Sequence, residues 1–389
     1  MKKSQCILLF LLSILFTSAN SVYNVNVATF GAKPDGKTDT TKPFLAAWAV
    51  ACGSTKSVEL YVPQGRYLIG QAIFKGPCKN NATNIKIDGT LVAPTNYWDL
   101  ENTGYWILFN KVNGVSISGG TLDGQGAGFW ACRAAGKNCP NGARSLTFNG
   151  ARNVNVKGLT SINSQASHIV INGCNNVIMQ GLKIVAPDNS PNTDGIHVQT
   201  STGVTITGTS IKTGDDCISI GPGTRNLMIV GVNCGPGHGI SIGSLGKDAI
   251  EDGVQNVTVK TVTFTGSDNG LVLAKTSAST GFVRGILYQD VIMKNVKNPI
   301  IVDQHYCPRN EACPSQNSGI KISQVTYRNI RGSSATPIAM KFDCSVTNPC
   351  REMNVINVKL TYQNNPAQSS CLNADGKISS SVSASSCLN

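Results

Sequence analysis

The chain has 389 residues, a formal charge of +12 and 14 cysteines. The positive charge suits an anionic polymer, but no dense block of Lys and Arg is interleaved with aromatic residues, which argues against nucleic acid. Beyond the first residues, no segment is apolar over the length that a bilayer requires, which argues against a membrane protein.

The first 21 residues have the order of a secretory signal peptide. Lys2 and Lys3 precede an apolar run at residues 7–16, and small residues follow it. An uncleaved membrane anchor is the alternative, but the apolar run is short for a bilayer. We therefore expect residues 1–21 to be removed and a secreted chain to begin near Val22, with a charge of 12 − 2 = +10.

The mature chain is expected to begin with one helix and then to repeat short strands. Residues 42–52, KPFLAAWAVAC, have apolar residues at helical spacing. The strand-like segments each begin at a turn residue, alternate apolar and polar residues, and usually meet a glycine before they resume. They begin at Asn84, Gly114, Asn153, Asn176, Gly203, Asn226 and Asn256.

The spacing of these segments indicates a solenoid. Their first apolar positions follow one another at steps of 23, 27, 23 and 30 residues, from Val154 through Val177, Val204 and Leu227 to Val257. Such a period is typical of stacked coils that share one core. A β-sandwich or a propeller is the alternative, but the hairpin turns of the first and the longer repeat of the second are not the rule here.

We therefore expect an all-β protein, a right-handed parallel β-helix, with residues 22–389 as a single domain. The helix at residues 42–52 would cap the N-terminal coil, because an open solenoid end exposes both core and strand edges. The Ser-rich tail from Cys371 onward would close the other end through Cys387.

Because secreted proteins fold in an oxidising compartment, we expect the cysteines to form disulfides. Without Cys6 in the signal segment, 14 − 1 = 13 cysteines remain, and Cys174 is left over as a buried free thiol on a strand. The sequons at Asn81 and Asn256 are candidate glycosylation sites. The expected disulfides are Cys52 with Cys78, Cys132 with Cys139, Cys217 with Cys234, Cys307 with Cys313, Cys344 with Cys350, and Cys371 with Cys387.

Three polar residues recur at one position of consecutive coils. Asp194, Asp216 and His238 are 22 residues apart, and a short apolar strand follows each of them. Coils stack at roughly 4.7–4.9 Å, so these side chains should form a line on one face. Asp215 precedes the line by one residue, and Gly214 permits a bend that lets Asp215 lean beside it.

Such a cluster has the components of glycoside hydrolysis. Crowded carboxylates cannot all ionise easily, so one should hold a proton while another stays ionised. A protonated acid can serve the leaving oxygen and an ionised base can activate water. The sequence therefore predicts a catalytic cluster of Asp194, Asp215, Asp216 and His238.

Two other interpretations of the carboxylates remain open. A structural Asx-turn would explain Asp194 alone, but not the repetition of Asp, Asp and His in register. A calcium site is the stronger alternative, although His238 is a poor ligand for a hard cation. His168, His197 and His305 are interpreted as surface or core residues, and we expect no metal and no cofactor.

At these residues the sequence resembles the polygalacturonases, which are pectin-cleaving glycoside hydrolases of the parallel β-helix type. The motifs are NTD at residues 192–194, GDD at 214–216 and GHG at 237–239. FGAKPDGKTD near the start and NPIIVDQHYC late in the chain are similar to plant members, especially the pollen-type exo-acting enzymes.

The resemblance implies a role for each matching residue. Asp215 would be the general acid, Asp194 and Asp216 would activate the water, and His238 would support the acid and the sugar. Asn192 and Tyr306 would line the substrate groove. The family inverts the anomeric centre, whereas neighbours one coil apart suggest the shorter carboxyl separation that is associated with retention.

The sequence departs from the family after Asn269 and Gly270. Plant members carry an Arg-Ile-Lys segment there, whose cations bind the galacturonate carboxylate, whereas this chain continues LVLAKTSAST. Val272 and Ala274 occupy the cationic positions unless the chain slips by one residue, in which case Lys275 supplies the lysine. Loss of a guanidinium–carboxylate contact should weaken the binding of an acidic sugar.

Three functions follow from these observations. The first is a secreted, extracellular cell-wall hydrolase of α-1,4-galacturonosyl linkages in pectin, acting as a monomer on this acidic polysaccharide, with exo-action left open. The second is a hydrolase of a less acidic or branched pectic polymer. The third is a catalytically silent pectin-binding homologue, which the altered segment favours and the intact aspartates oppose.

Overall fold

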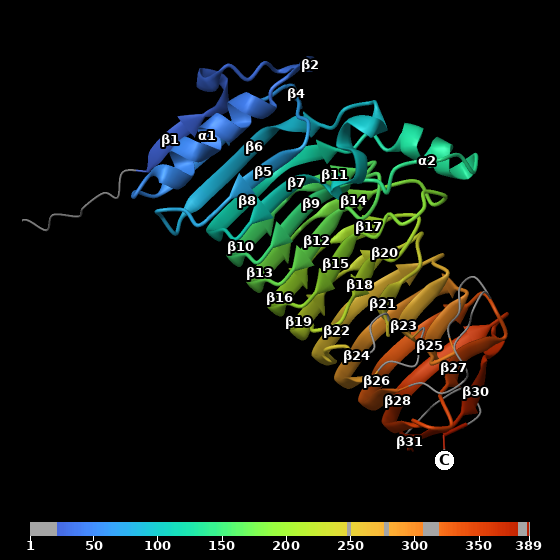
Figure 1. Cartoon of the computed structure of the whole chain (residues 1–389). Helices are drawn as coiled ribbons and strands as arrows, with labels where there is room; N and C mark the ends of the chain where they lie inside the picture. The colour runs from blue at the N-terminus through green and yellow to red at the C-terminus, as the bar shows by residue number, and fades with distance from the viewer. Residues whose placement is uncertain (1–21, 247–249, 276–279, 306–318, 380–386, 389) are drawn as a thin grey trace, which may run out of the picture.

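The computed structural model describes residues 22–246, 250–275, 280–305, 319–379 and 387–388. Its strands stack like rungs from the N-terminal to the C-terminal end of an elongated molecule (Figure 1). They form two sheets, in which every strand except the short antiparallel one at residues 365–366 pairs in parallel with its counterparts one coil away. The chain is therefore a parallel β-helix. The signal segment, residues 1–21, lies outside the described residues.

One sheet has eleven strands, and the polar residues predicted from the sequence lie next to its central strands. Its order is the order of the chain, with one strand from each coil. The strands are β5 (Ala72–Lys75), β7 (Tyr105–Asn110), β9 (Arg144–Asn149), β12 (Ile169–Asn172), β15 (Ile196–Gln199), β18 (Ile218–Ile220), β21 (Ile240–Leu245), β23 (Asn269–Lys275), β25 (Asn298–Asp303), β27 (Ile338–Asp343) and β30 (Gln368–Leu372).

The second sheet has twenty strands, because most coils contribute one long strand or two short ones to it. These are β1 (Tyr23–Asn26), β2 (Asp35–Asp39), β3 (Val58–Val62), β4 (Arg66–Leu68), β6 (Thr83–Val92), β8 (Asn113–Asp123), β10 (Arg152–Lys157), β11 (Thr160–Ile162), β13 (Asn175–Gln180), β14 (Lys183–Val185), β16 (Thr202–Thr207), β17 (Ser210–Lys212), β19 (Arg225–Val230), β20 (Asn233–Cys234), β22 (Val254–Thr265), β24 (Gly281–Val296), β26 (Ile320–Ser334), β28 (Cys350–Tyr362), β29 (Asn365–Pro366) and β31 (Ala374–Ser379).

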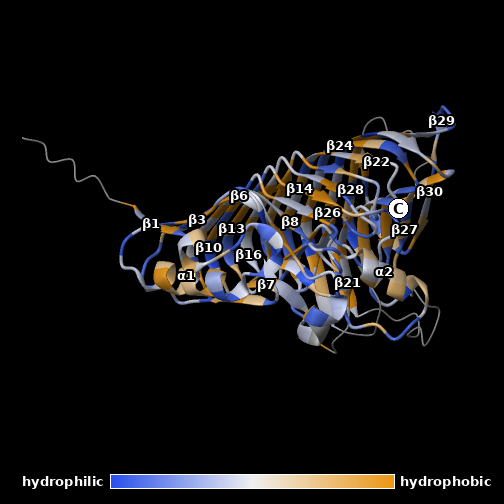
Figure 2. Cartoon of the chain, turned by 90° about the horizontal axis from the view of Figure 1, so that it is seen from above, coloured by the Kyte–Doolittle hydropathy of each residue, from blue (hydrophilic) through white to orange (hydrophobic). Residues whose placement is uncertain are grey.

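The register confirms the repeat that the sequence predicts. Val154 pairs with Val177, Val177 with Val204, Val204 with Leu227, and Leu227 with Val257. All five side chains are at most 1% exposed, so they form one interior column. Apolar and polar residues alternate along the strands (Figure 2), because successive side chains point to opposite faces.

The interior also stacks aromatic rings between coils. The ring centres of Phe74 and Phe109 are 4.8 Å apart, and those of Phe109 and Phe148 are 5.4 Å apart. Farther along, Tyr288 stacks on Tyr327 at 5.1 Å. Stacked coils place identical positions above one another, so one aromatic residue per coil becomes a continuous stack.

The turns explain the recurring Asn and Gly residues. Asn153, Asn176 and Asn226 have φ values of 52°, 57° and 54°, and Gly203 has 67° at the same position of its coil. Asn and Gly tolerate this left-handed conformation better than other residues. The Asn176 amide also donates to Asn153 Oδ1 at 2.7 Å, so the turn residues form a hydrogen-bonded ladder along the coils.

The expected helix is present as α1 (Thr41–Gly53), which packs against β1, β3 and β5 at the N-terminal end (Figure 1). It buries Phe44 and Trp48, and the Trp48 indole donates to the Lys75 carbonyl at 3.0 Å. A second helix, α2 (Ala127–Ala134), was not expected from the sequence. The described residues also form two short 3₁₀ helices, η1 (Val27–Phe30) and η2 (Tyr97–Thr103).

Five of the six expected disulfides are bonds in the structure: Cys52–Cys78, Cys132–Cys139, Cys217–Cys234, Cys344–Cys350 and Cys371–Cys387. The expected pair Cys307–Cys313 lies outside the described residues. Cys174 is free and buried, as expected. The expectation that it lies on a strand is wrong, because Cys174 occupies the turn between β12 and β13, where its thiol contacts the Phe148 and Asn172 carbonyls.

Both candidate glycosylation sites, Asn81 and Asn256, are exposed. The Asn256 amide donates to Asn226 Oδ1 at 3.1 Å and belongs to the turn ladder. Among the described residues, no helix has the length and apolar character needed to cross a membrane.

Candidate active site

Three consecutive strands of the eleven-stranded sheet align the polar residues. Ile196 of β15 pairs with Ile218 of β18, which pairs with Ile240 of β21. Asp194, Asp216 and His238 each stand two residues before these isoleucines. They therefore occupy one position on successive coils, as the spacing of 22 residues predicts.

The turn before β18 places Asp215 beside this line. The Gly214 N–H donates to the Thr193 hydroxyl at 3.0 Å. A Cβ atom on residue 214 would lie 2.1 Å from the Ser190 carbonyl oxygen, so only glycine fits this close approach. The turn thereby directs Asp215 toward the neighbouring coils.

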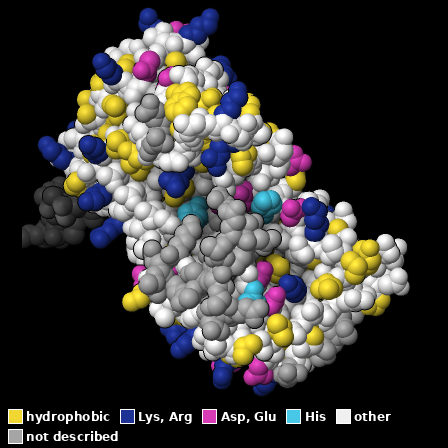
Figure 3. Space-filling model, turned by 45° about the vertical axis from the view of Figure 1, so that its right-hand side comes forward, with side chains coloured by type: hydrophobic (Ala, Val, Ile, Leu, Met, Phe, Trp, Pro, Cys, Tyr) yellow, Lys and Arg dark blue, Asp and Glu magenta, His cyan; other side chains and the backbone are white. Residues whose placement is uncertain are grey.

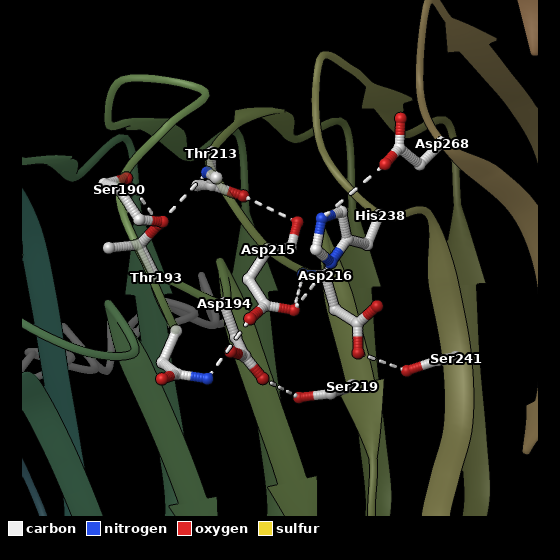
Figure 4. Close-up of polar contacts among 12 residues, drawn as sticks. Ser190, Thr193, Asp194, Thr213, Asp215, Asp216, Ser219, His238, Ser241 and Asp268 are labelled. Atoms are coloured by element: carbon white, nitrogen blue, oxygen red, sulfur yellow. Dashed lines mark hydrogen bonds and ion pairs between the residues drawn. The ribbon is translucent and has the colours of Figure 1, made fainter. Parts of the chain in front are cut away.

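Asp215 lies between the coils that precede and follow it (Figure 4). The Asn192 amide donates to its Oδ2 at 3.3 Å, and His238 Nδ1 lies 3.1 Å from its Oδ1. The Asp215 side chain is 23% exposed and that of His238 is 44% exposed. Both groups therefore remain accessible to a ligand in solution.

Serine hydroxyls orient the other two carboxylates. Ser219 donates to Asp194 Oδ2 at 2.6 Å, and Ser241 donates to Asp216 Oδ2. Ser219 and Ser241 pair with each other on β18 and β21. Each serine lies one coil beyond the carboxylate that it holds, so the strand register fixes both orientations.

His197 supports Asp194 through Ser219. Its Nδ1 lies 2.7 Å from Ser219 Oγ, which in turn donates to Asp194. Its Nε2 lies 3.0 Å from Gln199 Oε1. The interpretation of His197 as a core or surface residue missed this contact; its place on β15, one coil before Ser219, was the available signal.

Burial and mutual repulsion raise the pKa values of the paired carboxyls. Burial is the largest cause for Asp194, followed by the charge of Asp215, while the Ser219 hydrogen bond opposes them. The pKa of Asp216 is raised well above its usual value by burial, then by the charges of Asp194 and Asp215. The pair therefore resists double ionisation.

This arrangement predicts a stability cost at neutral pH. The pKa of Asp216 in the folded protein lies above its usual value of 3.8, so folding favours the protonated carboxyl. Stability should fall as pH rises from about 4 through the raised pKa. Asp216→Asn mimics the neutral form. The free energy of unfolding in urea should therefore be equal for variant and wild type at low pH, and increasingly larger for the variant toward neutral pH.

The exposed carboxyl of Asp375 provides the matched control for this prediction. Asp375→Asn should change the free energy of unfolding only slightly, and this change should not grow with pH as that of the Asp216 variant does. Equal stability of wild type and Asp216→Asn from acid to neutral pH would contradict the burial argument.

His238 is held between two carboxylates. The Asp215 hydrogen bond is the largest cause that raises its pKa; burial opposes this, and the charges of Asp215, Asp216 and Asp268 add to it. Asp268 Oδ2 lies 3.9 Å from His238 Nε2, and Asp268 Oδ1 forms an ion pair with Lys297 Nζ at 2.5 Å. The sequence interpretation did not identify Asp268 or Lys297.

The remaining candidates have mixed outcomes. Asn192 contacts Asp215, as described above. Lys275 lies on β23 and pairs with Leu245, but its side chain is outside the described residues, as is all of Tyr306. His168 is fully buried, and burial lowers its pKa to about 3, so it is a neutral core residue.

The cluster could also coordinate a cation. Asp215, Asp216 and His238 each offer a ligand atom, and these atoms lie within 4.8 Å of one another. The imidazole is an unfavourable ligand for Ca²⁺ or Mg²⁺, which prefer oxygen. The donor set therefore fits acid–base chemistry better than a hard-cation site.

A hollow extends from these residues toward the C-terminal coils. It has a volume of about 140 Å³. Acidic and histidine side chains gather near the middle of the face shown in Figure 3. The hollow is lined by Asp215, Asp216, His238, Ser241, Gly243, Ser244, Asn269, Val272, Ile301 and Asp303.

Known proteins share this sequence and fold. A polygalacturonase from Prunus persica is 57% identical over 387 residues, which cover 98% of each chain. An exopolygalacturonase from Platanus acerifolia is 42% identical and covers 92% of this chain and 95% of its own.

Solved structures show the same fold at lower identity. An endo-xylogalacturonan hydrolase from Aspergillus tubingensis has a TM-score of 0.80 at 21% identity, covering 93% of this chain and all of its own. A polygalacturonase from Erwinia carotovora has a TM-score of 0.72 at 24% identity, and the match covers 92% of this chain and 97% of its own. The model of glycosyl hydrolases family 28 matches residues 52–387. With this match and these relatives, the chain belongs to family 28 of the glycosyl hydrolases.

Proposed function

We propose that this protein is a secreted polygalacturonase that hydrolyses α-1,4-galacturonosyl linkages of pectin in the cell wall. The observation that carries the proposal is the position of Asp215 between Asn192 and His238, beside the coupled pair Asp194 and Asp216. The similarity to polygalacturonases supports the substrate. The five disulfides and the predicted signal peptide support secretion.

The proposed reaction uses one acid and one base. Asp215 donates its proton to the glycosidic oxygen as the bond between that oxygen and C1 breaks. The oxygen of a water molecule bonds to C1, and the water proton passes to the Asp194–Asp216 pair. One water is consumed, one new reducing end is formed, and proton exchange with solvent restores both carboxyl groups.

We propose inversion at C1, which the resemblance to the polygalacturonases supports. The geometry points the other way, because oxygens of Asp215 and Asp216 lie within 4.8 Å, and short carboxyl separations are associated with retention. The anomer released first, followed by NMR during early hydrolysis, distinguishes the two outcomes.

Other features of the proposal follow from the fold and the relatives. Residues 22–389 form one domain that acts as a monomer, without metal or cofactor, and α1 caps the N-terminal coil of a right-handed β-helix. Exo-action is supported by the exopolygalacturonase among the relatives. Analysis of products at low conversion tests it, since exo-action releases monomer from the start.

The direct test is the release of reducing ends from polygalacturonate in the presence of EDTA. Activity that matches the rate without EDTA is expected. Loss of activity with EDTA, restored by a divalent cation, would contradict the metal-free mechanism. Binding of polygalacturonate without turnover would contradict the enzymatic function and favour a silent pectin-binding homologue.

The ion pair of Asp268 with Lys297 should tune the pH profile through His238. Asp268→Asn removes a carboxylate 3.9 Å from His238 Nε2, so the pKa of His238 should fall. In the pH profile of kcat/KM, the decline at alkaline pH should move to lower pH by a few tenths of a pH unit. An exposed ion pair is worth about 0.2–1 kcal/mol, and one pKa unit corresponds to about 1.4 kcal/mol.

Lys297→Met is the opposing variant. It leaves the Asp268 carboxylate unneutralised, so the pKa of His238 and the alkaline limb should rise. Shifts of both variants in the same direction would contradict the electrostatic effect of Asp268 on the pKa of His238.

A further inference from the structure

The outward face of the eleven-stranded sheet changes character along the groove. Ser219 of β18 pairs with Ser241 of β21, Ser241 with Val272 of β23, and Val272 with Ile301 of β25. The two serines hold the carboxylates of Asp194 and Asp216. The next two coils present branched aliphatic side chains at the same position. The floor of the groove therefore turns from polar to apolar immediately beyond the proposed catalytic residues.

These aliphatic side chains belong to the hollow that contains the site. Val272 and Ile301 line it together with Asp215, Asp216 and His238. Val272 is 8% exposed, although its position on the strand faces outward. From the Ser241 strand to the Ile301 strand there are two coil steps, or about 10 Å, which is enough for a sugar ring beyond the reacting bond.

A carboxyl group lies beside this apolar floor, because Asp303 follows Ile301 by two residues on the same strand and therefore faces the same side of the sheet. Asp303 of β25 also lines the hollow, and burial raises its pKa because its ionised form is poorly solvated there, so a second anion beside it is unfavourable. Its neighbours are Asp343, His305 and Lys341, whose charges act on Asp303 in opposing directions. An anionic sugar on Val272 and Ile301 would therefore contact hydrocarbon below it and the Asp303 carboxyl group beside it.

Two lysines at or next to the neighbouring strands β25 and β27 are already paired with carboxylates. Lys297 Nζ lies 2.5 Å from Asp268 Oδ1, and Lys341 Nζ lies 3.1 Å from Asp343 Oδ2. In the described part of the chain, no Lys or Arg lines the hollow. Among the described residues, a free uronate carboxylate placed there would lose water without gaining a cationic partner, which is unfavourable.

A methyl ester of the same sugar meets none of these costs. It carries no charge, so Asp303 does not repel it, and its methyl group can pack against the two aliphatic side chains. Ser241, Ser244 and Asn269 line the same hollow and offer polar groups for the ester carbonyl and the sugar hydroxyls. Burial of one methyl group is worth about 0.8 kcal/mol, a factor of about four in affinity.

We propose that the groove beyond Asp216 is a subsite for a methyl-esterified galacturonosyl residue, with its ester methyl group against Val272 and Ile301. This inference rests on the proposed polygalacturonase function and specifies its substrate. It selects partially esterified pectin over fully de-esterified galacturonan.

The first test compares one polygalacturonate preparation that is methyl-esterified to increasing degrees. The wild-type protein should show a maximum of kcat/KM at an intermediate degree, at least about fourfold above the de-esterified polymer. A rate that only falls as esterification rises would overturn the inference and leave the proposed function intact. Loss of hydrolysis on every member of the series would instead contradict the proposed function.

The second test changes the floor of the groove. Val272→Arg introduces a guanidinium that can bind a free carboxylate, so kcat/KM on de-esterified polymer should rise about tenfold and the preference should reverse. Met228→Arg adds the same charge at an exposed position of the other sheet and should leave the preference unchanged. Equal behaviour of the two variants would overturn the inference.

A third variant tests the carboxyl group without altering the apolar floor. Asp303 Oδ1 accepts a hydrogen bond from the His305 N–H at 2.8 Å, and Asp303→Asn retains that acceptor. It should improve hydrolysis of the de-esterified polymer while activity on the esterified polymer stays within about twofold. An equal loss on both substrates would overturn the role of Asp303.

A rhamnogalacturonan substrate separates the ester from a neutral sugar as the occupant. The proposal expects it to be cleaved more slowly than esterified galacturonan. Faster cleavage of rhamnogalacturonan would show that the subsite binds an uncharged sugar and would overturn the methyl-ester assignment.

Discussion

Asp215→Asn is expected to lower kcat on polygalacturonate by about 10²–10⁴-fold, the range that general acid catalysis contributes. An amide cannot supply the proton that the departing glycosidic oxygen needs. It retains an acceptor oxygen near Asn192 and a similar shape, so the circular dichroism spectrum and oligogalacturonate binding should change little. Initial rates of reducing-end release measure the effect.

A substrate that needs no acid makes this prediction specific. Galacturonosyl fluoride releases fluoride without prior protonation, so Asp215→Asn should hydrolyse it at close to the wild-type rate. Asp216→Asn should remain impaired on the fluoride, because water still requires its base. Asp375→Asn, at an exposed carboxyl far along the chain, is the control for the substitution itself. Full activity of Asp215→Asn on polygalacturonate would place the acid elsewhere.

Phe148→Ala is expected to cost about 3–5 kcal/mol of unfolding free energy, as large-to-small changes at buried aromatic positions do. Phe148 is 0% exposed, and its ring stacks on Phe109 at 5.4 Å in the aromatic column of the interior. Removing one ring opens a cavity between coils, and the rigid stacking of strands prevents the neighbouring coils from closing it. Urea unfolding followed by fluorescence measures the loss.

Two matched variants define that effect. Phe148→Leu keeps most of the hydrocarbon and should cost clearly less than Phe148→Ala. Met228→Ala, at a side chain that is 49% exposed, should change stability by no more than about 0.5 kcal/mol. A cost below about 1 kcal/mol for Phe148→Ala would show that the coils collapse into the cavity.

The arrangement of the coils was largely predictable from the sequence. The steps between Val154, Val177, Val204, Leu227 and Val257 are the observed register of the long sheet. The line of Asp194, Asp216 and His238 follows in the same way from the pairing of three isoleucines. The helix α2 was missed, because eight residues between strands carry too little periodicity to separate a helix from a loop.

The contacts around the carboxylates were not predictable in the same way. His197 reaches Asp194 only through Ser219 on the next coil, and Asp268 reaches His238 from a coil that begins after a longer connection. Residue spacing predicts which positions stack on one another, but it does not predict how a side chain on one coil is oriented toward the side chains of the next coil.

The sequence by itself determined the period of the coils. It thereby also determined the line of Asp194, Asp216 and His238, because residues at equal steps along stacked coils occupy equivalent positions. Only the tertiary structure decided which side chains surround Val272 beyond that line. The step from Ser241 to Val272 is 31 residues and that from Val272 to Ile301 is 29, so connections of unequal length conceal the shared position. The motif alignment already places Val272 at this position, but strand pairing alone brings Ile301 and Asp303 beside it, because hydrogen bonds between backbones, and not distance along the chain, set which side chains become neighbours.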